Sequence, residues 1–194
     1  MELLKERIRR EGKVLPGNII KVDGFLNHRV DTKLLNDIAD EFARYFDVSK
    51  ITTVLTAEAS GIALATICAQ KFGVPMLFAK KAKSDNIESG LYQSEVFSYT
   101  YKKKVTLLVS QEWLSADDHV LIIDDFMANG FAMQGLVDIV NAAGATLEGI
   151  GVAVEKGFQG GGDKFRAMEG VRYKALAVIE KADENGIIFR EDEE

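Results

Sequence analysis

The stretch HVLIIDDFMANGFAMQG, residues 119–135, is the part of the sequence that decides the fold. Its four apolar residues, 120–123, predict a buried strand, and the spacing of apolar residues from about Gly130 predicts a helix. Asp124 and Asp125 directly follow the strand, where burying two carboxylates would cost free energy. The stretch therefore predicts a strand, a tight loop and a helix, and the acidic pair calls for a functional explanation.

Strand and helix patterns alternate on both sides of this stretch. We expect strands at residues 51–57, 74–81, 147–156 and 173–182, and helices at residues 31–46, 60–73 and 131–145. This alternation predicts an α/β protein with a mostly parallel sheet and helices on both faces. Two further segments, residues 94–101 and 104–110, alternate apolar and polar side chains and predict an antiparallel pair. Asp31 is the expected N-cap of the helix at 31–46.

The composition indicates a globular protein with one domain, since 47% of its 194 residues are hydrophobic and 28% are charged. The formal net charge of −6 gives no general attraction to nucleic acid, so we expect no nucleic-acid partner. We also expect no membrane partner, because no apolar run approaches the roughly 18 residues of a membrane span. The one cysteine, Cys68, fits a core position in a protein of the reducing cytoplasm.

Three loops are expected at the carboxyl ends of the strands, where ligands of parallel sheets gather. They read AEASG (57–61), DDFMANG (124–130) and EKGFQGGGD (155–163). In the second loop the acidic pair lies earlier than a helix cap should, and Asn129 and Gly130 permit the positive torsions of an anion cradle. Carboxylates beside a phosphate suit hydroxyl groups or a metal ion. A ligand with both hydroxyls and phosphate is therefore predicted, as in a sugar phosphate.

Other ligand motifs do not occur in the sequence. It contains no G-x-x-x-x-G-K-[ST] loop and no G-x-G-x-x-G in a first strand–helix unit. No pair of His or Cys residues has metal-ligand spacing, so we expect no metal site made by the protein alone. The glycine cluster QGGGDKF, residues 159–165, is weak evidence by itself.

The motif VLIIDDFMANGFA resembles the thirteen-residue signature of type I phosphoribosyltransferases, and TAEASGIALA resembles their pyrophosphate loop. The segments KVDGFLNHRVD and GIGVAVEKGFQ resemble the purine branch of that family. The resemblance covers nearly the whole chain. It implies one domain over residues 1–194, with a core at about 31–155, a small hood from about 1–30 and about 156–194, and a flexible hairpin loop. The polar loop 83–93 is expected to close over the substrate.

The resemblance implies transfer of the 5-phosphoribosyl group from 5-phosphoribosyl 1-pyrophosphate (PRPP) to a purine nitrogen. Asp124 and Asp125 are the expected catalytic pair, holding the ribose hydroxyls directly or through Mg²⁺ that enters with PRPP. The 5′-phosphate loop is expected at Ala128, Asn129, Gly130, Phe131 and Ala132, and the pyrophosphate loop at Glu58, Ala59, Ser60 and Gly61. Ser60 can also serve as a plain helix N-cap, and Lys80 and Lys81 are either pyrophosphate partners or solvated lysines.

Purine recognition is expected from four residues, of which Lys156 would donate to the purine O6 and Asn27 would read the O2 edge. Phe158 would stack on the ring, or pack as a core aromatic, and Ile20 would flank it. Xanthine is the expected base, with xanthosine 5′-monophosphate as the product. Hypoxanthine and guanine are the alternatives, because they share the 6-oxo group.

A second class of function is a non-catalytic, purine-sensing regulator on the same fold. The sequence disfavours it, because no helix-turn-helix precedes the core and no basic stripe accompanies it. Family members usually work as dimers, so the resemblance also implies a homodimer.

Overall fold

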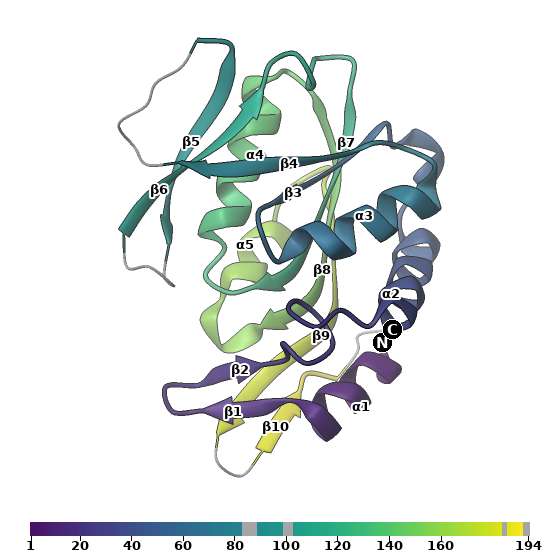
Figure 1. Ribbon diagram of the computed structural model, residues 1–194, viewed down its shortest axis with the longest axis vertical. Helices are drawn as coiled ribbons and strands as arrows, with labels where there is room; N and C mark the ends of the chain where they lie inside the picture. Colours follow the sequence, from purple (N-terminus) through teal and green to yellow (C-terminus); the bar gives the residue numbers. More distant parts are fainter. Residues whose placement is uncertain (83–88, 99–102, 184–185, 192–194) are drawn as a thin grey trace.

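The computed structural model describes residues 1–82, 89–98, 103–183 and 186–191. Its centre is an eight-stranded sheet in the order β10-β9-β8-β7-β3-β4-β6-β5 (Figure 1). The strands are β3 (Thr53–Ala57), β4 (Met76–Ala82), β5 (Leu91–Ser98), β6 (Lys103–Ser110), β7 (His119–Met127), β8 (Thr146–Lys156), β9 (Arg172–Asp183) and β10 (Gly186–Phe189). The helices are α1 (Glu2–Glu11), α2 (Thr32–Tyr45), α3 (Gly61–Phe72), α4 (Phe131–Ala142) and α5 (Gly161–Arg166), with short 3₁₀ turns η1 (Val48–Lys50) and η2 (Gly157–Gln159).

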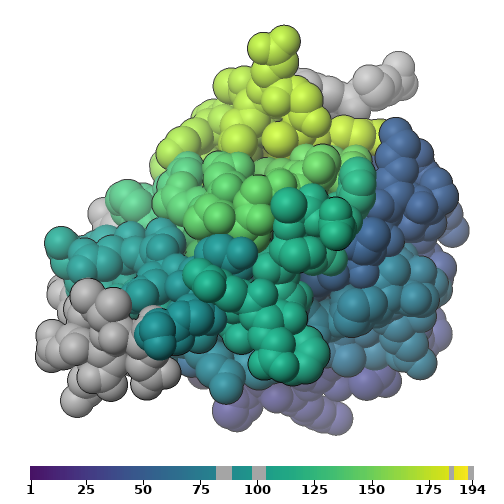
Figure 2. Space-filling model, turned by 90° about the horizontal axis from the view of Figure 1, so that it is seen from above, coloured from purple at the N-terminus to yellow at the C-terminus, as the bar shows by residue number. Residues whose placement is uncertain are grey.

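The middle of the sheet is parallel and both of its edges are antiparallel. Strands β4, β3, β7, β8 and β9 pair in parallel, and β10 and the β5–β6 hairpin pair antiparallel at the two edges. The predicted parallel sheet and the antiparallel pair are confirmed. In the predicted loop 83–93, residues 83–88 lie outside the described residues, and residues 91–93 begin β5. In the space-filling view the hairpin forms a lobe at one side of the molecule (Figure 2).

The helices bury apolar residues on the two faces of the sheet. One buried cluster joins α1, α2 and α3 to one face, and the other joins α4 and the β5–β6 hairpin to the opposite face. Asp31 caps α2 as predicted, accepting from the N–H groups of Lys33 at 3.1 Å and Leu34 at 3.2 Å. Cys68 lies fully buried in the first cluster, as expected. Each face of the sheet is therefore covered by at least one helix.

Helix α1 packs on β9 and β10, so the first helix of the chain lies beside its last strands (Figure 1). The small sheet β1 (Lys13–Leu15) and β2 (Ile19–Lys21) turns through Gly17 and Asn18, whose φ angles are 84° and 58°. The amino group of Met1 donates to the Leu176 carbonyl of β9 at 2.7 Å. None of the described helices is long and apolar enough to span a membrane.

The main correction to the sequence-based expectation concerns β7. This strand does not end at the acidic pair but continues to Met127, so Asp124 and Asp125 lie within it. The reason is the pairing with β8, which continues past the acidic pair to Phe126 opposite Val154 and Met127 opposite Glu155. Strand β10 is an element that the sequence pattern did not predict.

Candidate active site

Two adjacent carboxylates are buried at the carboxyl end of β7. Asp124 is 8% exposed and Asp125 is 3% exposed. Because successive side chains of a strand point to opposite faces, the two carboxylates meet different neighbours. The Asp125 N–H also donates to Asp124 Oδ1 at 2.9 Å, which ties the backbone to the first carboxylate.

The carboxylate of Asp125 accepts hydrogen bonds from two neutral side chains. Asn27 Nδ2 donates to Oδ2 at 2.7 Å, and Ser60 Oγ donates to Oδ1 at 2.8 Å. Ser60 stands at the N-cap position of α3, but its side chain makes no capping hydrogen bond and is directed to Asp125 instead. The structure therefore brings together residues 27, 60 and 125, which the sequence analysis placed on base, pyrophosphate and ribose.

Asp124 is held in a different environment. Burial, followed by the neighbouring charge of Asp125, raises the pKa of Asp124 well above the ordinary value of an aspartate. A Cβ atom added to Gly61 would lie 2.3 Å from Asp124 Oδ1 and 2.2 Å from Thr56 Oγ1. Only glycine at position 61 therefore lets the start of α3 approach this carboxylate. The Thr56 hydroxyl is buried without a hydrogen-bond partner among the described residues.

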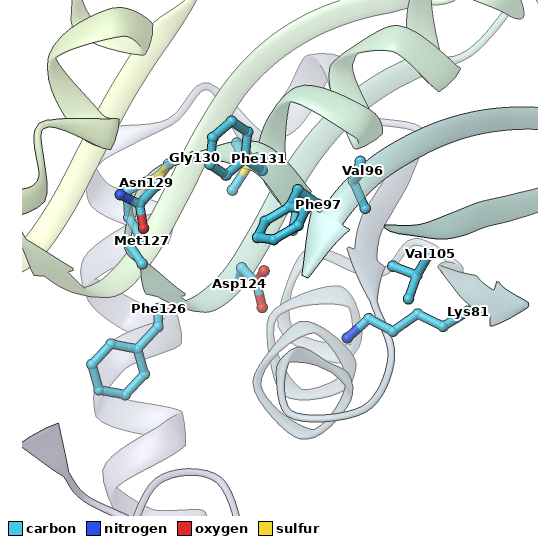
Figure 3. Close-up of a pocket in the computed structure, with 13 residues that line it drawn as sticks. Lys81, Val96, Phe97, Val105, Asp124, Phe126, Met127, Asn129, Gly130 and Phe131 are labelled. Carbon is cyan, nitrogen blue, oxygen red and sulfur yellow. The ribbon is translucent and has the colours of Figure 1, made fainter. Parts of the chain in front are cut away.

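A pocket of about 180 Å³ opens beside Asp124. In Figure 3 the Lys81 side chain extends toward Asp124 from β4, while Phe126 lies on the same strand as Asp124. Asp125 is not among the residues that line the pocket. The lining residues are Lys81, Val96, Phe97, Val105, Asp124, Phe126, Met127, Ala128, Asn129, Gly130, Phe131, Ala132 and Met133.

One wall of the pocket is the predicted phosphate loop with the start of α4. Gly130 takes a φ of 81° at the N-cap, and the first helical hydrogen bond runs from Gln134 N–H to the Gly130 carbonyl at 2.8 Å. The N–H groups of the first turn have no carbonyl one turn earlier within the helix, and the helix dipole adds partial positive charge there. All five residues predicted for this loop, 128–132, line the pocket. The wall is suited to an anion.

The predicted pyrophosphate loop lies between β3 and α3. Its Glu58–Ala59 peptide bond is cis. Glu58 donates its N–H to the Ala79 carbonyl at 3.0 Å, and its carboxylate accepts from Lys81 N–H at 2.6 Å. The N–H groups left for an anion are therefore those of residues 59–61.

The four residues predicted to bind the base differ in how they are connected to the pocket and to the acidic pair. Lys156 Nζ lies 5.6 Å from the centre of the Phe126 ring, and burial lowers the pKa of Lys156 below the ordinary value of a lysine. Phe158 is 38% exposed, whereas Ile20 is 6% exposed within the first buried cluster. The structure thus links Lys156 to the pocket through Phe126 and links Asn27 to the acidic pair through Asp125, but leaves Ile20 mostly in the core.

Sequence reasoning missed two parts of this site. Phe126 follows Asp124 by two positions in β7, so it would have been found on the same strand face if the strand had been extended to Met127. The apolar wall of Val96, Phe97 and Val105 comes from the β5–β6 hairpin, and no local motif marks those residues as pocket lining.

The carboxylates of Asp124 and Asp125 are the candidate protein ligands for a divalent cation. Among the described residues no group of three or more His, Cys, Asp or Glu side chains is arranged to hold a metal ion. Mg²⁺ is commonly held by one or two carboxylates together with oxygens of a phosphorylated substrate. The Asp124 and Asp125 carboxylates fit that pattern if a substrate supplies the remaining ligands.

Comparison with known proteins identifies the class. A model of the phosphoribosyl transferase domain matches residues 25–178. The chain belongs to the phosphoribosyltransferase family. The geometry of the site agrees with this family. Asp124 and the loop 128–132 line one pocket, and Ser60 of the loop 58–61 bonds to the neighbouring Asp125.

The particular relatives are more specific than the family. The chain is 50% identical to a xanthine phosphoribosyltransferase of Lachnoclostridium phytofermentans, with 99% of this chain and all of the relative covered. It is 51% identical to a xanthine phosphoribosyltransferase of Bifidobacterium longum, covering 98% of this chain and 100% of the relative.

Solved structures share the fold at low identity. Adenine phosphoribosyltransferase of Trypanosoma brucei matches with a TM-score of 0.72 at 21% identity, over 90% of this chain and 78% of that protein. The enzyme of Rhodothermus marinus matches with a TM-score of 0.72 at 17% identity, over 92% of this chain and 100% of that protein. The predicted type I phosphoribosyltransferase fold is confirmed.

Asp124→Asn is expected to stabilise the folded protein at neutral pH. The raised pKa of Asp124 means that the native state binds its proton more tightly than the unfolded state, so stability falls as pH rises above about 4. Asparagine has no charge to bury there. We expect a higher Tm at pH 7, by about 2–4 °C for each kcal/mol gained, and a difference that shrinks toward pH 4.

Asp118→Asn is the matched control for this measurement. Burial opposes the charge of Asp118, but hydrogen bonds from Ser115, Thr52 and Thr53 outweigh it and keep the pKa of Asp118 below its usual range. This variant should lose Tm at pH 7. An Asp124→Asn protein with an unchanged or lower Tm at pH 7 would contradict the assigned environment of Asp124.

Proposed function

We propose that this protein is a purine salvage enzyme that transfers the 5-phosphoribosyl group of PRPP to N9 of xanthine. The products are xanthosine 5′-monophosphate and pyrophosphate. The observation that carries the proposal is the linked site, in which Asp124 and the loop 128–132 line one pocket and Phe126 connects that pocket to Lys156. The two full-length relatives that carry the name xanthine phosphoribosyltransferase support the choice of base.

The sugar phosphate would bind with its phosphate at the loop and its ribose at the acidic pair. Backbone N–H groups at the start of α4 would hold the 5′-phosphate, since Asn129 and Ala132 offer no hydroxyl there. Asp124 faces the pocket and would accept from the ribose hydroxyls. Asp125, already held by Asn27 and Ser60, would contribute its negative charge to the same region.

The reaction breaks the bond between C1 of the ribose and the pyrophosphate oxygen and forms a bond from C1 to N9. The purine supplies the electron pair, pyrophosphate leaves with the electrons of the broken bond, and the ring proton lost by the purine would pass to that departing pyrophosphate. Positive charge would develop on the ribose, as in other glycosyl transfers, and the two carboxylates would stabilise it. Mg²⁺ bound with PRPP would neutralise charge on the leaving group.

The remaining walls have separate tasks. Residues 59–61 and the ammonium of Lys81 would bind pyrophosphate at the ends of β3 and β4. The apolar hairpin wall of Val96, Phe97 and Val105 would exclude water, which would otherwise hydrolyse the activated sugar.

Lys156 would select the base by donating to the purine O6. An ammonium there favours 6-oxo over 6-amino purines, because it has donors and no acceptor. The partly exposed Phe158 would stack on the ring. Asn27 Nδ2 donates one hydrogen to Asp125, so its second N–H would donate to the xanthine O2, and its carbonyl oxygen would accept from a ring N–H beside O2. Ile20 would contribute only the small part of its surface that is not buried in the core.

The domain arrangement and assembly complete the proposal. Residues 1–30 and 156–194 would form the hood over a core at 31–155, consistent with the packing of α1 on β9 and β10 and the hydrogen bond from Met1 to Leu176 (Figure 1). The enzyme would act as a homodimer in the cytoplasm. A free, fully buried Cys68 is consistent with a reducing compartment.

The test of the proposed function is a panel assay with PRPP and Mg²⁺. Xanthine, guanine, hypoxanthine, adenine and orotate are offered separately, and nucleotide formation is measured. We expect the highest kcat/KM for xanthine, lower values for guanine and hypoxanthine, and no turnover of adenine or orotate. Preference for hypoxanthine or guanine would overturn the choice of base. No turnover of any base, combined with tight binding of DNA or RNA, would favour a regulator.

Lys156→Met is expected to impair use of the base far more than use of PRPP. The substitution keeps the length of the side chain and removes the ammonium, whose hydrogen bond to a substrate oxygen is worth about 1.5–3 kcal/mol. We expect the KM for xanthine to rise at least about tenfold, with less than a twofold change in the KM for PRPP. Lys33→Met, at a side chain 88% exposed, is the control and should match the wild type. Equal changes in both KM values would argue against base recognition by Lys156.

A further inference from the structure

A fully buried carboxylate lies directly before Lys156, at Glu155 in β8. Arg166 of α5 donates to both of its oxygens, with Nη1 2.9 Å from Oε1 and Nη2 2.5 Å from Oε2. The Tyr173 hydroxyl of β9 donates to Oε2 at 2.8 Å. Burial, followed by the charge of Glu155, raises the pKa of Tyr173, so this hydroxyl keeps its proton.

Such an ion pair, with a fully buried carboxylate and a guanidinium side chain that is 34% exposed, is not an efficient way to stabilise a core. Removing charges from water costs about as much as the pair regains, and apolar residues of similar volume are often equally stable. The arrangement nevertheless holds the short helix α5 in one place, because a forked guanidinium bound by both oxygens accepts few alternative geometries. The contacts of α5 with the rest of the protein therefore indicate the role of the ion pair between Glu155 and Arg166.

Helix α5 packs with its backbone directly on the phosphate loop. A Cβ atom at Gly161 would lie 2.1 Å from the Ala128 carbonyl oxygen and 2.7 Å from the Gly130 nitrogen. A Cβ atom at Gly162 would lie 2.3 Å from Glu155 Oε1. The two glycines thus face opposite partners, one against the loop and the other against the buried carboxylate.

The underside of the loop is closed by one aromatic ring. Phe165 of α5 is fully buried, and its ring lies 3.0 Å from the position of a Cβ atom at Gly130. The same ring stacks with Tyr173, with centroids 6.5 Å apart and planes at 20°. Contacts therefore run without interruption from Glu155 through α5 to the backbone of residues 128–130.

We infer that Glu155 and Arg166 are positioning residues, which fix the phosphate loop through α5 and its glycines. The inference rests on the proposed function, since it takes residues 128–132 as the site of the 5′-phosphate. Glu155 does not line the pocket and would touch no substrate. Its effect on PRPP passes through Gly161, because any shift of α5 moves the loop that must present its N–H groups to the phosphate.

Gly161→Ala tests the contact between α5 and the loop. The added methyl group overlaps backbone, so the loop or the helix must shift, and a displacement of about 1 Å can cost up to about a hundredfold in a positioned site. We expect the Kd for PRPP with Mg²⁺, measured by calorimetry without a base, to rise at least about tenfold. The KM for xanthine should change less than twofold.

Gly160→Asn is the matched control. Gly160 has a φ of 71° and nothing within 4 Å of a Cβ position, and asparagine tolerates that torsion. This variant should bind PRPP like the wild type.

Arg166→Lys provides a second test that adds no bulk, since lysine cannot reproduce the two-oxygen fork. It should weaken PRPP binding at least about threefold, with thermal unfolding recorded to confirm the fold.

The outcomes separate the inference from the proposed function. A wild type that binds PRPP but converts none of the five bases defeats the proposed function, while the calorimetric comparison still tests the positioning role. An unchanged Kd for PRPP in folded Gly161→Ala and Arg166→Lys proteins overturns the inference. Equal losses for PRPP and xanthine overturn it as well, because they indicate a general structural defect.

Discussion

The structure depends on the burial of two adjacent carboxylates at the carboxyl end of β7. Taking charges out of water is unfavourable unless donors replace the lost water, and the surrounding chain supplies them unequally. Asp125 receives the neutral donors of Asn27 and Ser60, whereas burial and the charge of Asp125 raise the pKa of Asp124. Burial of the charge is therefore better compensated at Asp125 than at Asp124, as expected for a functional site that costs the protein some stability.

Glycine makes this arrangement possible at each of the closest approaches. Gly61 admits α3 to Asp124, Gly161 admits α5 to the phosphate loop, and Gly162 admits α5 to Glu155. The obstacles to a Cβ atom are the Thr56 hydroxyl and the Asp124 carboxylate at Gly61, the backbone of residues 128–130 at Gly161 and the Glu155 carboxylate at Gly162, and the three side chains are themselves buried. The shape of the site thus depends on these glycines, which have no side chain, as much as on the functional groups.

Sequence periodicity was sufficient for most of the architecture, because buried parallel strands and amphipathic helices have different apolar spacing. The acidic pair and its loop were recognisable for the same reason, as a polar interruption between two apolar elements. The length of β7 could not be predicted from the sequence, because its last residues are held by pairing with β8, which is a contact between distant segments. Strand β10 was missed for another reason: its pairing with the preceding β9 is local, but its four residues, Gly186–Phe189, are too few to show a strand period.

The same limit applies to individual side chains. The sequence showed Ser60 at a helix start but could not show that its hydroxyl reaches Asp125, 65 positions away. The cluster QGGGDKF was weak evidence alone, and its meaning depends on the carboxylate of Glu155 and the backbone of residue 128, which only the fold places against it. Local patterns identified the chemistry, whereas the distances that make it a site are properties of the folded chain.

The most direct test of the central claim is the crystal structure of the protein with PRPP and Mg²⁺. We expect the 5′-phosphate against the backbone N–H groups of residues 128–132, the ribose hydroxyls at the Asp124 carboxylate and the pyrophosphate at residues 59–61. A phosphate bound elsewhere, or a ribose without contact to Asp124 directly or through Mg²⁺, would contradict it.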